Sequence, residues 1–182
     1  MGLFTNEVRM GLGFAILGKD ENQMKYEFTG ETKKVGLFGN IIVRRIRATI
    51  AFGVVKAGDL GGWIEKEENL SQEGDAWVYG DARVYGDARV YGDAKVCGDA
   101  RVCGDAWVLQ VNHLLVIGPI GSRNSFTTFF RDKDKTISVK CGCFFGKIDR
   151  FIEKVQETHG DNKYALVYRA VVEVAKAQID LN

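Results

Sequence analysis

One feature constrains the fold of this 182-residue chain more than any other, a hexapeptide repeated six times without interruption. The repeat runs from Gly74 to Leu109 and reads GDAWVY, GDARVY, GDARVY, GDAKVC, GDARVC, GDAWVL. A hexamer of this kind cannot bury its own apolar side chains, so neighbouring copies must stack around a shared interior. The tandem copies therefore predict a solenoid.

Two positions of the repeat are always apolar and suit a narrow interior. One column consists of Val78, Val84, Val90, Val96, Val102 and Val108, and the other of Ala76, Ala82, Ala88, Ala94, Ala100 and Ala106. If three hexamers form one triangular coil, each residue stacks on the residue eighteen positions later, and strands of successive coils lie about 4.8 Å apart. The pattern predicts a short left-handed parallel β-helix.

Glycine opens every repeat, and aspartate follows it. Glycine fits the corner of a coil, where a positive φ is expected, and the aspartate can hydrogen-bond the turn backbone. The six-residue period continues beyond the perfect copies, through Ile64 and Leu70 in the alanine column and through Leu114 and Ile120 in the valine column. We therefore expect the β-helix to occupy residues 58–121.

Two outward columns carry basic and aromatic side chains, and Trp77 and Trp107 are expected to face outward in one of them. The binding candidates among them are Tyr79, Arg83, Tyr85, Arg89, Tyr91, Lys95 and Arg101. Basic and aromatic residues together can bind nucleic acid through phosphate contacts and base stacking. The alternative is a solvated face on which each basic side chain offsets the charge of the neighbouring aspartates, because the repeat block is itself net acidic.

The segment before the repeat has a β-type pattern. Short runs at Lys25–Phe28, Lys33–Val35 and Ile41–Arg47 are separated by glycines and predict a β-rich cap over residues 1–57. An open end of a β-helix exposes unpaired strand groups, which such a cap would cover. The first 20 residues match no pattern.

Residues 122–182 predict a small α+β unit. The runs Ser125–Arg131 and Thr136–Lys140 form a β-hairpin pattern, and two segments with apolar residues at helical spacing follow. Gly160 is expected to end the first helix, and Asp161 to cap the start of the second. The chain is thus expected to be mainly β, with a β cap before the β-helix and a hairpin plus two helices after it.

A polar edge is expected where the β-helix meets the C-terminal unit. Its residues are Ser122, Arg123, Asn124, Thr127, Thr128 and Arg131. Their side chains would offer donors to a carboxylate, a phosphate or a backbone carbonyl. The alternative is ordinary loop and cap chemistry, in which these donors satisfy the local backbone.

The residues that could carry chemistry do not form a catalytic set. Cys141 and Cys143 with His159 fall short of the four ligands in spaced pairs that zinc takes, so no metal is expected. Hexapeptide-repeat acyltransferases resemble this chain in scaffold and use a histidine as general base, for which His113 is the candidate. No protruding loop interrupts the repeats, and no second histidine or acid accompanies His113. We expect no enzymatic activity and no cofactor.

Composition excludes some settings. The net charge of +1 provides no bulk attraction to nucleic acid or membrane, and no apolar run reaches the roughly 18–20 residues that span a bilayer. The start, Met1–Asn6, lacks both signal-peptide and myristoylation patterns. Four cysteines without an export signal indicate reduced thiols, so we expect a cytoplasmic protein of a bacterial host that binds no membrane.

The order of segments resembles a family of small left-handed β-helix proteins found on phages and mobile elements of gut bacteria. The resemblance covers about residues 25–178. The motifs that carry it are Phe28–Thr32, Lys56–Ile64, Glu67–Ser71, the GDA-V repeats, Gly118–Asn124, Thr127–Arg131 and Glu157–Tyr164. Length and arrangement also resemble a group of inhibitors of the type II CRISPR effector nuclease.

The resemblance implies a non-enzymatic binding protein that occupies a surface of a bacterial defence nuclease or of its guide complex. One alternative is a trimeric acyltransferase-like enzyme, which would bind coenzyme A and depend on His113. Another is a structural protein or a sponge that holds a signalling nucleotide. Each of the three would involve homo-oligomers, because a short β-helix exposes flat aromatic faces. Direct contact with nucleic acid is compatible with the basic columns.

Overall fold

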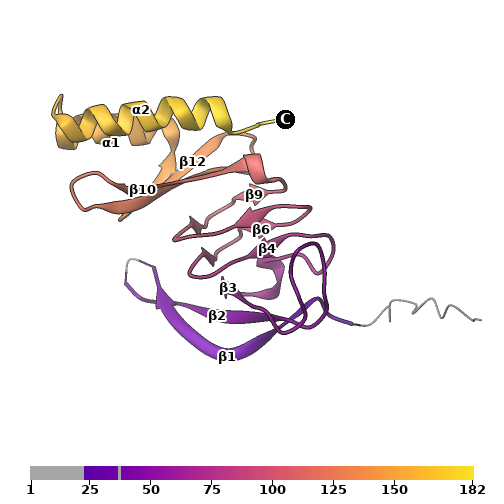
Figure 1. Ribbon diagram of the computed structural model, residues 1–182. Helices are drawn as coiled ribbons and strands as arrows, with labels where there is room; N and C mark the ends of the chain where they lie inside the picture. Colours follow the sequence, from indigo (N-terminus) through magenta and orange to yellow (C-terminus); the bar gives the residue numbers. More distant parts are fainter. Residues whose placement is uncertain (1–22, 37) are drawn as a thin grey trace, which may run out of the picture.

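The computed structural model describes residues 23–36 and 38–182, so the expectations for the start of the chain lie outside the described residues. A stack of short coils forms the middle of the molecule, with a long β-hairpin at one end and a sheet covered by two helices at the other (Figure 1). The chain is mainly β with two helices, as expected.

Each hexapeptide contributes one two-residue strand. These strands are β4 (Trp77–Val78), β5 (Arg83–Val84), β6 (Arg89–Val90), β7 (Lys95–Val96), β8 (Arg101–Val102) and β9 (Trp107–Val108). They pair in parallel as β4–β7, β5–β8 and β6–β9, which aligns Trp77 with Lys95, Arg83 with Arg101 and Arg89 with Trp107. Three hexamers therefore make one coil, and the predicted stacking of each residue on the residue eighteen positions later is confirmed.

The interior and the corners of the coils also follow the prediction. All six valines and all six alanines of the repeat are at most 1% exposed and belong to one core. The corner glycines have φ angles from 56° at Gly80 to 72° at Gly86, in the left-handed region that glycine reaches without a steric penalty. The repeat thus sets both the narrow core and the sharp turns.

The repeat aspartates do not behave as expected. Among the described residues their carboxylates make no hydrogen bond to the turn backbone. Three of them reach outward to lysines of other segments instead, in the pairs Lys33–Asp81, Lys66–Asp87 and Lys133–Asp105. A long lysine side chain can reach an exposed corner carboxylate, and this competes with the turn hydrogen bond.

The first coil departs from the six-residue period. Ile64 pairs with Val84 and Leu70 bridges to Val90, so these partners are twenty residues apart instead of eighteen. The expectation that Ile64 and Leu70 continue the alanine column is therefore wrong, and both lie in the valine column. Val78, the next residue of the valine column, lies eight positions after Leu70 instead of six. Two extra residues at this corner therefore explain the shift.

The N-terminal hairpin joins the solenoid through a shared sheet. Strands β1 (Tyr26–Val35), β2 (Ile41–Ala48) and β3 (Leu60–Ile64) are antiparallel, and β3 then pairs in parallel with β5, giving the order β1-β2-β3-β5-β8. Lys25 is buried beside β1, and its ammonium donates to the carbonyl of Ala76 at 3.0 Å. Its burial lowers the pKa of Lys25 to about 8.

The C-terminal unit is an antiparallel sheet with two helices packed on it (Figure 1). Its elements are β10 (Leu114–Ile120), β11 (Ser125–Arg131), β12 (Ile137–Cys141), β13 (Phe144–Lys147), α1 (Ile148–His159) and α2 (Lys163–Gln178), and short 3-10 turns lie at Glu67–Asn69 and Val111–His113. The predicted β11–β12 hairpin and the Gly160 C-cap are confirmed.

Two expectations for this unit need correction. Asn162 rather than Asp161 caps α2, since its side chain accepts hydrogen bonds from the amides of Tyr164 and Ala165. Ile120 does not extend the valine column, because β10 leaves the coil and pairs in an antiparallel manner with β11. Leu114, in contrast, is buried at the end of the solenoid core.

Asp132 fastens the β11–β12 hairpin to the last coil. Its carboxylate is fully buried and accepts hydrogen bonds from the hydroxyls of Thr136 and Ser138 and from the ammonium of Lys147, at 2.8, 2.7 and 2.6 Å. Its backbone bridges to Ala106. Burial raises the pKa of Asp132, but these donors outweigh it, so the pKa lies below its ordinary value.

Replacing Asp132 by asparagine is expected to destabilise the fold by about 2–4 kcal/mol, since several donors lose a charged acceptor. The lowered pKa implies that this stabilisation is complete above about pH 4 and is lost as the pH falls through the native pKa. Urea unfolding of both proteins at several pH values measures the effect. Asp134→Asn is the control, because Asp134 is exposed and shares Lys147. Equal effects of the two substitutions would contradict the assignment.

Candidate anion-binding cleft

Successive hexamers occupy different faces of the coil, so the predicted outward columns do not form one surface. Arg83 and Arg101 lie on the face formed by β5 and β8, Lys95 lies on that of β4 and β7, and Arg89 lies on that of β6 and β9. The seven binding candidates of the repeat are therefore divided among three faces. Only candidates from the same hexamer, or from hexamers that stack on one another, share a face.

A hollow of about 390 Å³, which we name the basic cleft, is lined by five basic residues and by no carboxylate among residues 23–36 and 38–182. The cations are Lys34, Arg83, Arg101, Arg123 and Lys140. They come from three parts of the chain: the end of β1, the paired strands β5 and β8, and the C-terminal sheet with its β10–β11 turn. The basic cleft therefore exists only when the three parts are packed together.

Local structure explains how the cations meet. Parallel pairing places Arg83 directly beside Arg101. Lys34 lies at the end of β1, where it lines the hollow together with Val35 and Gly36. On the other side, the amide of Arg101 donates to the hydroxyl of buried Thr128 at 3.1 Å, which joins β8 to β11. Strand β12, which carries Lys140, pairs with β11 at this point.

The charges of the basic cleft lack partners within the part of the chain that the structure describes. None of its five cations forms an ion pair there, although Lys140 donates to the carbonyl of Gly142 at 2.9 Å. The Nε of Arg83 is buried and has no hydrogen-bond acceptor among the residues that the structure describes. Like charges side by side on paired strands repel, and a buried donor without an acceptor is costly. An anion with several oxygens would relieve the repulsion between the cations.

The remaining candidates of the polar edge lie in different environments. Ser122, Arg123 and Asn124 are exposed, and Arg123 alone of these three reaches the basic cleft. Arg131 is only 5% exposed, and its Nε and Nη1 have no partner among the described residues. Arg131 therefore does not offer its donors at the surface as expected, because β11 carries it inward.

The tyrosines of the repeat differ from one another. Tyr85 is buried with Trp63 and Cys103 on the face of the basic cleft, and burial raises its pKa. Tyr79 is half-buried on another face. Trp77 was expected to face outward but lies in the core. Tyr26 and Phe52 pack edge-on against it, with ring centroids 6.2 and 5.3 Å from that of Trp77. Few aromatic side chains of the repeat are therefore exposed enough to stack on the bases of a nucleic acid.

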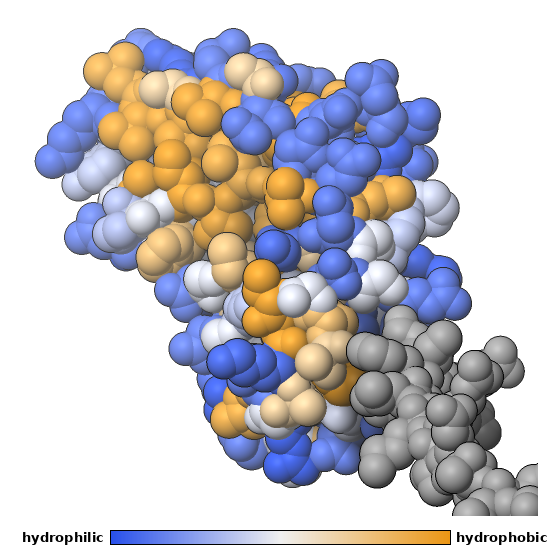
Figure 2. All heavy atoms as spheres, turned by 45° about the vertical axis from the view of Figure 1, so that its right-hand side comes forward, coloured by the Kyte–Doolittle hydropathy of each residue, from blue (hydrophilic) through white to orange (hydrophobic). Residues whose placement is uncertain are grey.

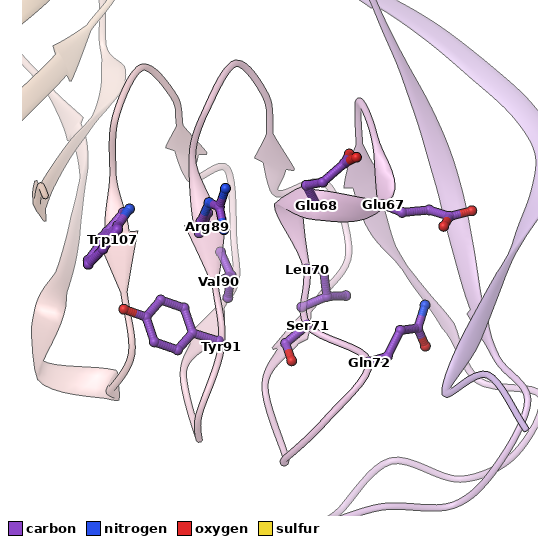
Figure 3. A pocket seen from close by; sticks show the side chains of 9 residues that line it. All are labelled: Glu67, Glu68, Leu70, Ser71, Gln72, Arg89, Val90, Tyr91 and Trp107. Carbon is purple, nitrogen blue, oxygen red and sulfur yellow. The ribbon is translucent and has the colours of Figure 1, made fainter. Parts of the chain in front are cut away.

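A second hollow, the aromatic groove, lies on the face of β6 and β9 and measures about 540 Å³. Tyr91 turns toward Trp107 in it, and the rings meet edge to face at 6.3 Å (Figure 3). Glu67 and Glu68 line it together with Arg89, so the groove carries charges of both signs. An anion is therefore less favoured here than in the basic cleft.

Three of the five cations, Arg83, Arg101 and Arg123, are among the residues predicted from the sequence, whereas Lys34 and Lys140 are not. Both lie outside the repeat, in strands whose position relative to the coils no local pattern encodes. A weak signal existed for Lys140, since apolar and polar residues alternate from Ile137 to Cys141 and place Lys140 opposite the apolar face of its strand. No such alternation surrounds Lys34, which follows another lysine.

His113 has a structural environment. It is 2% exposed, and its Nδ1 accepts a hydrogen bond from the amide of Leu109 at 3.3 Å, which holds the end of the last coil. Burial lowers its pKa. No group of three or more His, Cys, Asp or Glu side chains suited to a metal ion occurs within residues 23–36 and 38–182. No described helix is long and apolar enough to cross a bilayer.

Comparison with known proteins agrees with the solenoid. The family described as YdcK Beta solenoid repeat matches residues 76–92 and 82–98. A relative from Escherichia coli (strain K12), named "Uncharacterized acetyltransferase YdcK", is 40% identical over 63 residues. That segment is 35% of this chain and 18% of the relative, so the similarity concerns a small part of that protein. The name of this relative contradicts the expectation that the chain is not an enzyme.

Proposed function

We propose that the protein binds a ligand through phosphate, and that the basic cleft is its binding site. The observation that carries the proposal is the set of five cations around one hollow that no carboxylate of the described residues lines. Charge-assisted hydrogen bonds to phosphate are strong, and arginine in particular can contact two phosphate oxygens at once. Adjacent Arg83 and Arg101 suit such contacts.

One form of the ligand is an RNA backbone. The resemblance to inhibitors of the type II CRISPR effector nuclease suggests the guide RNA in the nuclease complex, held by its phosphates rather than by its sequence. In this form the protein would come from a phage or mobile element, act in the cytoplasm of its bacterial host and assemble as a homo-oligomer. We also propose that the coils are left-handed and that the flanking units cap both ends of the β-helix. The eighteen-residue length of each coil supports this proposal.

Acyl transfer is a second candidate function, favoured by the acetyltransferase relative. The phosphates of a coenzyme A donor would then occupy the basic cleft. The general base would have to be a residue other than His113, because His113 is buried and its Nδ1 is engaged. Turnover of acetyl-coenzyme A with amine or hydroxyl acceptors, lost in Arg101→Ala, would favour this candidate over simple binding.

Protection of Cys143 tests the location of the site. Cys143 is exposed and lines the basic cleft, whereas Cys97 is exposed at a corner of another face and serves as an internal control. Tripolyphosphate at ten times its dissociation constant is expected to slow alkylation of Cys143 by N-ethylmaleimide about tenfold, in proportion to the unbound fraction. Mass spectrometry of peptides would read both cysteines. Unchanged alkylation of Cys143, or equal protection of Cys97, would contradict the proposal.

A further inference from the structure

An apolar hollow of about 480 Å³ adjoins the basic cleft, and we name it the apolar pocket. Its floor is built by Phe151, Val155 and Tyr168 of the two helices, which are at most 8% exposed. Phe144 of β13 packs against Phe151 with ring centroids 5.2 Å apart. Among the described residues no carboxylate lines it, and Lys154, which does, forms an ion pair with Glu157 at 3.0 Å. Its volume lies within the range of about 300–1,000 Å³ typical of small-ligand pockets.

The two hollows share a wall. Arg123, Gly142 and Cys143 line both of them. Gly142 lies in the tight β12–β13 turn with φ of 55°, and a Cβ added there would meet nothing within 4 Å. The boundary is therefore formed by one flexible arginine, one cysteine and a residue without a side chain. A ligand can rest its charged head on one side of this boundary and extend an arm to the other.

Apolar side chains are also concentrated around this unit. Figure 2 shows hydrophobic residues gathered at the top of the view, over the C-terminal unit, whereas the coils below present more polar surface. A hollow with an aromatic floor and a cationic rim binds neither a purely ionic ligand nor a purely apolar one best. Burying an apolar arm contributes about 0.8 kcal/mol per methylene, and the phosphate head adds charge-assisted hydrogen bonds.

We propose that the natural ligand is amphipathic, a phosphate or pyrophosphate monoester of a medium-length alkyl chain, with its head in the basic cleft and its chain in the apolar pocket. This inference rests on the proposed function, because the head group uses the same cations. The inference adds that the part of the ligand attached to the phosphate head is an alkyl chain. Within a series of alkyl phosphates, affinity rises with chain length until the apolar pocket is filled.

Calorimetric titration with pyrophosphate and with butyl, hexyl and octyl phosphate tests the inference. Affinity is expected to rise by up to about fourfold per added methylene, the equivalent of about 0.8 kcal/mol. Thr158 is exposed on α1 and lines the apolar pocket, so Thr158→Trp should block the pocket without disturbing the fold. The gain with chain length should then disappear while pyrophosphate binding remains. Ser122→Trp, at another exposed lining position, serves as the second blocking variant.

Each outcome decides one claim. Pyrophosphate binding without any gain from longer chains would overturn the amphipathic ligand and leave the proposed function standing. Failure of pyrophosphate and of every alkyl phosphate would overturn both. A gain with chain length that persists in both blocking variants would overturn the apolar pocket as its location. Glu153→Trp is the matched control, since Glu153 is exposed on α1 and does not line the pocket, and it should keep the full gain.

Discussion

Arg101→Ala is expected to weaken the binding of tripolyphosphate by about tenfold to hundredfold, because one charge-assisted hydrogen-bonding group contributes about 1.5–3 kcal/mol. Arg101 is half-buried, pairs in register with Arg83 and has no ion-pair partner among the described residues. A guanidinium in that position loses little solvation on meeting an anion. Isothermal titration calorimetry of the two proteins, at low and at physiological ionic strength, measures the difference.

Lys95→Ala is the matched control for this substitution. Lys95 occupies the same position of the hexapeptide as Arg101 but lies on another face, outside the basic cleft. It should keep the affinity of the unmodified protein, and Arg123→Ala, at an exposed residue of the cleft, should lose affinity. If Lys95→Ala weakened binding as much as Arg101→Ala, the anion would be held by the general charge of the coils. The basic cleft would then not be the site.

Gly92→Ala is expected to destabilise the solenoid far more than the same change at Gly98. Both glycines have nearly the same left-handed φ, 68° and 66°. A Cβ at Gly92 would lie 2.5 Å from the carbonyl oxygen of Leu109, whereas one at Gly98 would meet nothing within 4 Å. Gly98→Ala should therefore cost about 1–2 kcal/mol for the backbone conformation alone. Gly92→Ala should cost about 2–5 kcal/mol, since the coil below must also move.

Urea unfolding of the two variants separates conformational strain from the close approach of coils. The fold depends on coils packed so tightly at this corner that no side chain fits between them. If Gly92→Ala lost no more stability than Gly98→Ala, the coils would not approach each other closely at Gly92, which would contradict the structure. The unmodified protein provides the common reference.

The repeat made the solenoid predictable because every copy meets the same environment. Once three hexamers close a coil, the valine column, the corner glycines and the pairing of Arg83 with Arg101 follow from the sequence alone. The prediction failed where the environment changes. Two extra residues beyond Leu70 shift the first coil, and an N-terminal segment buries Trp77, which the repeat itself leaves facing outward.

The candidate site was predictable only in part for the same reason. Arg83, Arg101 and Arg123 were found from the periodic columns and from the polar edge. Lys34 and Lys140 join them through packing between segments far apart in the chain. The periodic columns also predicted that Tyr85 is available for ligand binding. In the structure it packs into a small core with Trp63 and Cys103.

The most direct test of the central claim is a titration of isotopically labelled protein with tripolyphosphate, followed by amide NMR shifts. Binding in the basic cleft is expected to shift the amide signals of Val35, Gly142 and Cys143 and to leave those of Lys95 and Arg89, on the other two faces, unchanged. Shifts spread over all three faces, or no shifts at concentrations that saturate a specific site, would contradict it.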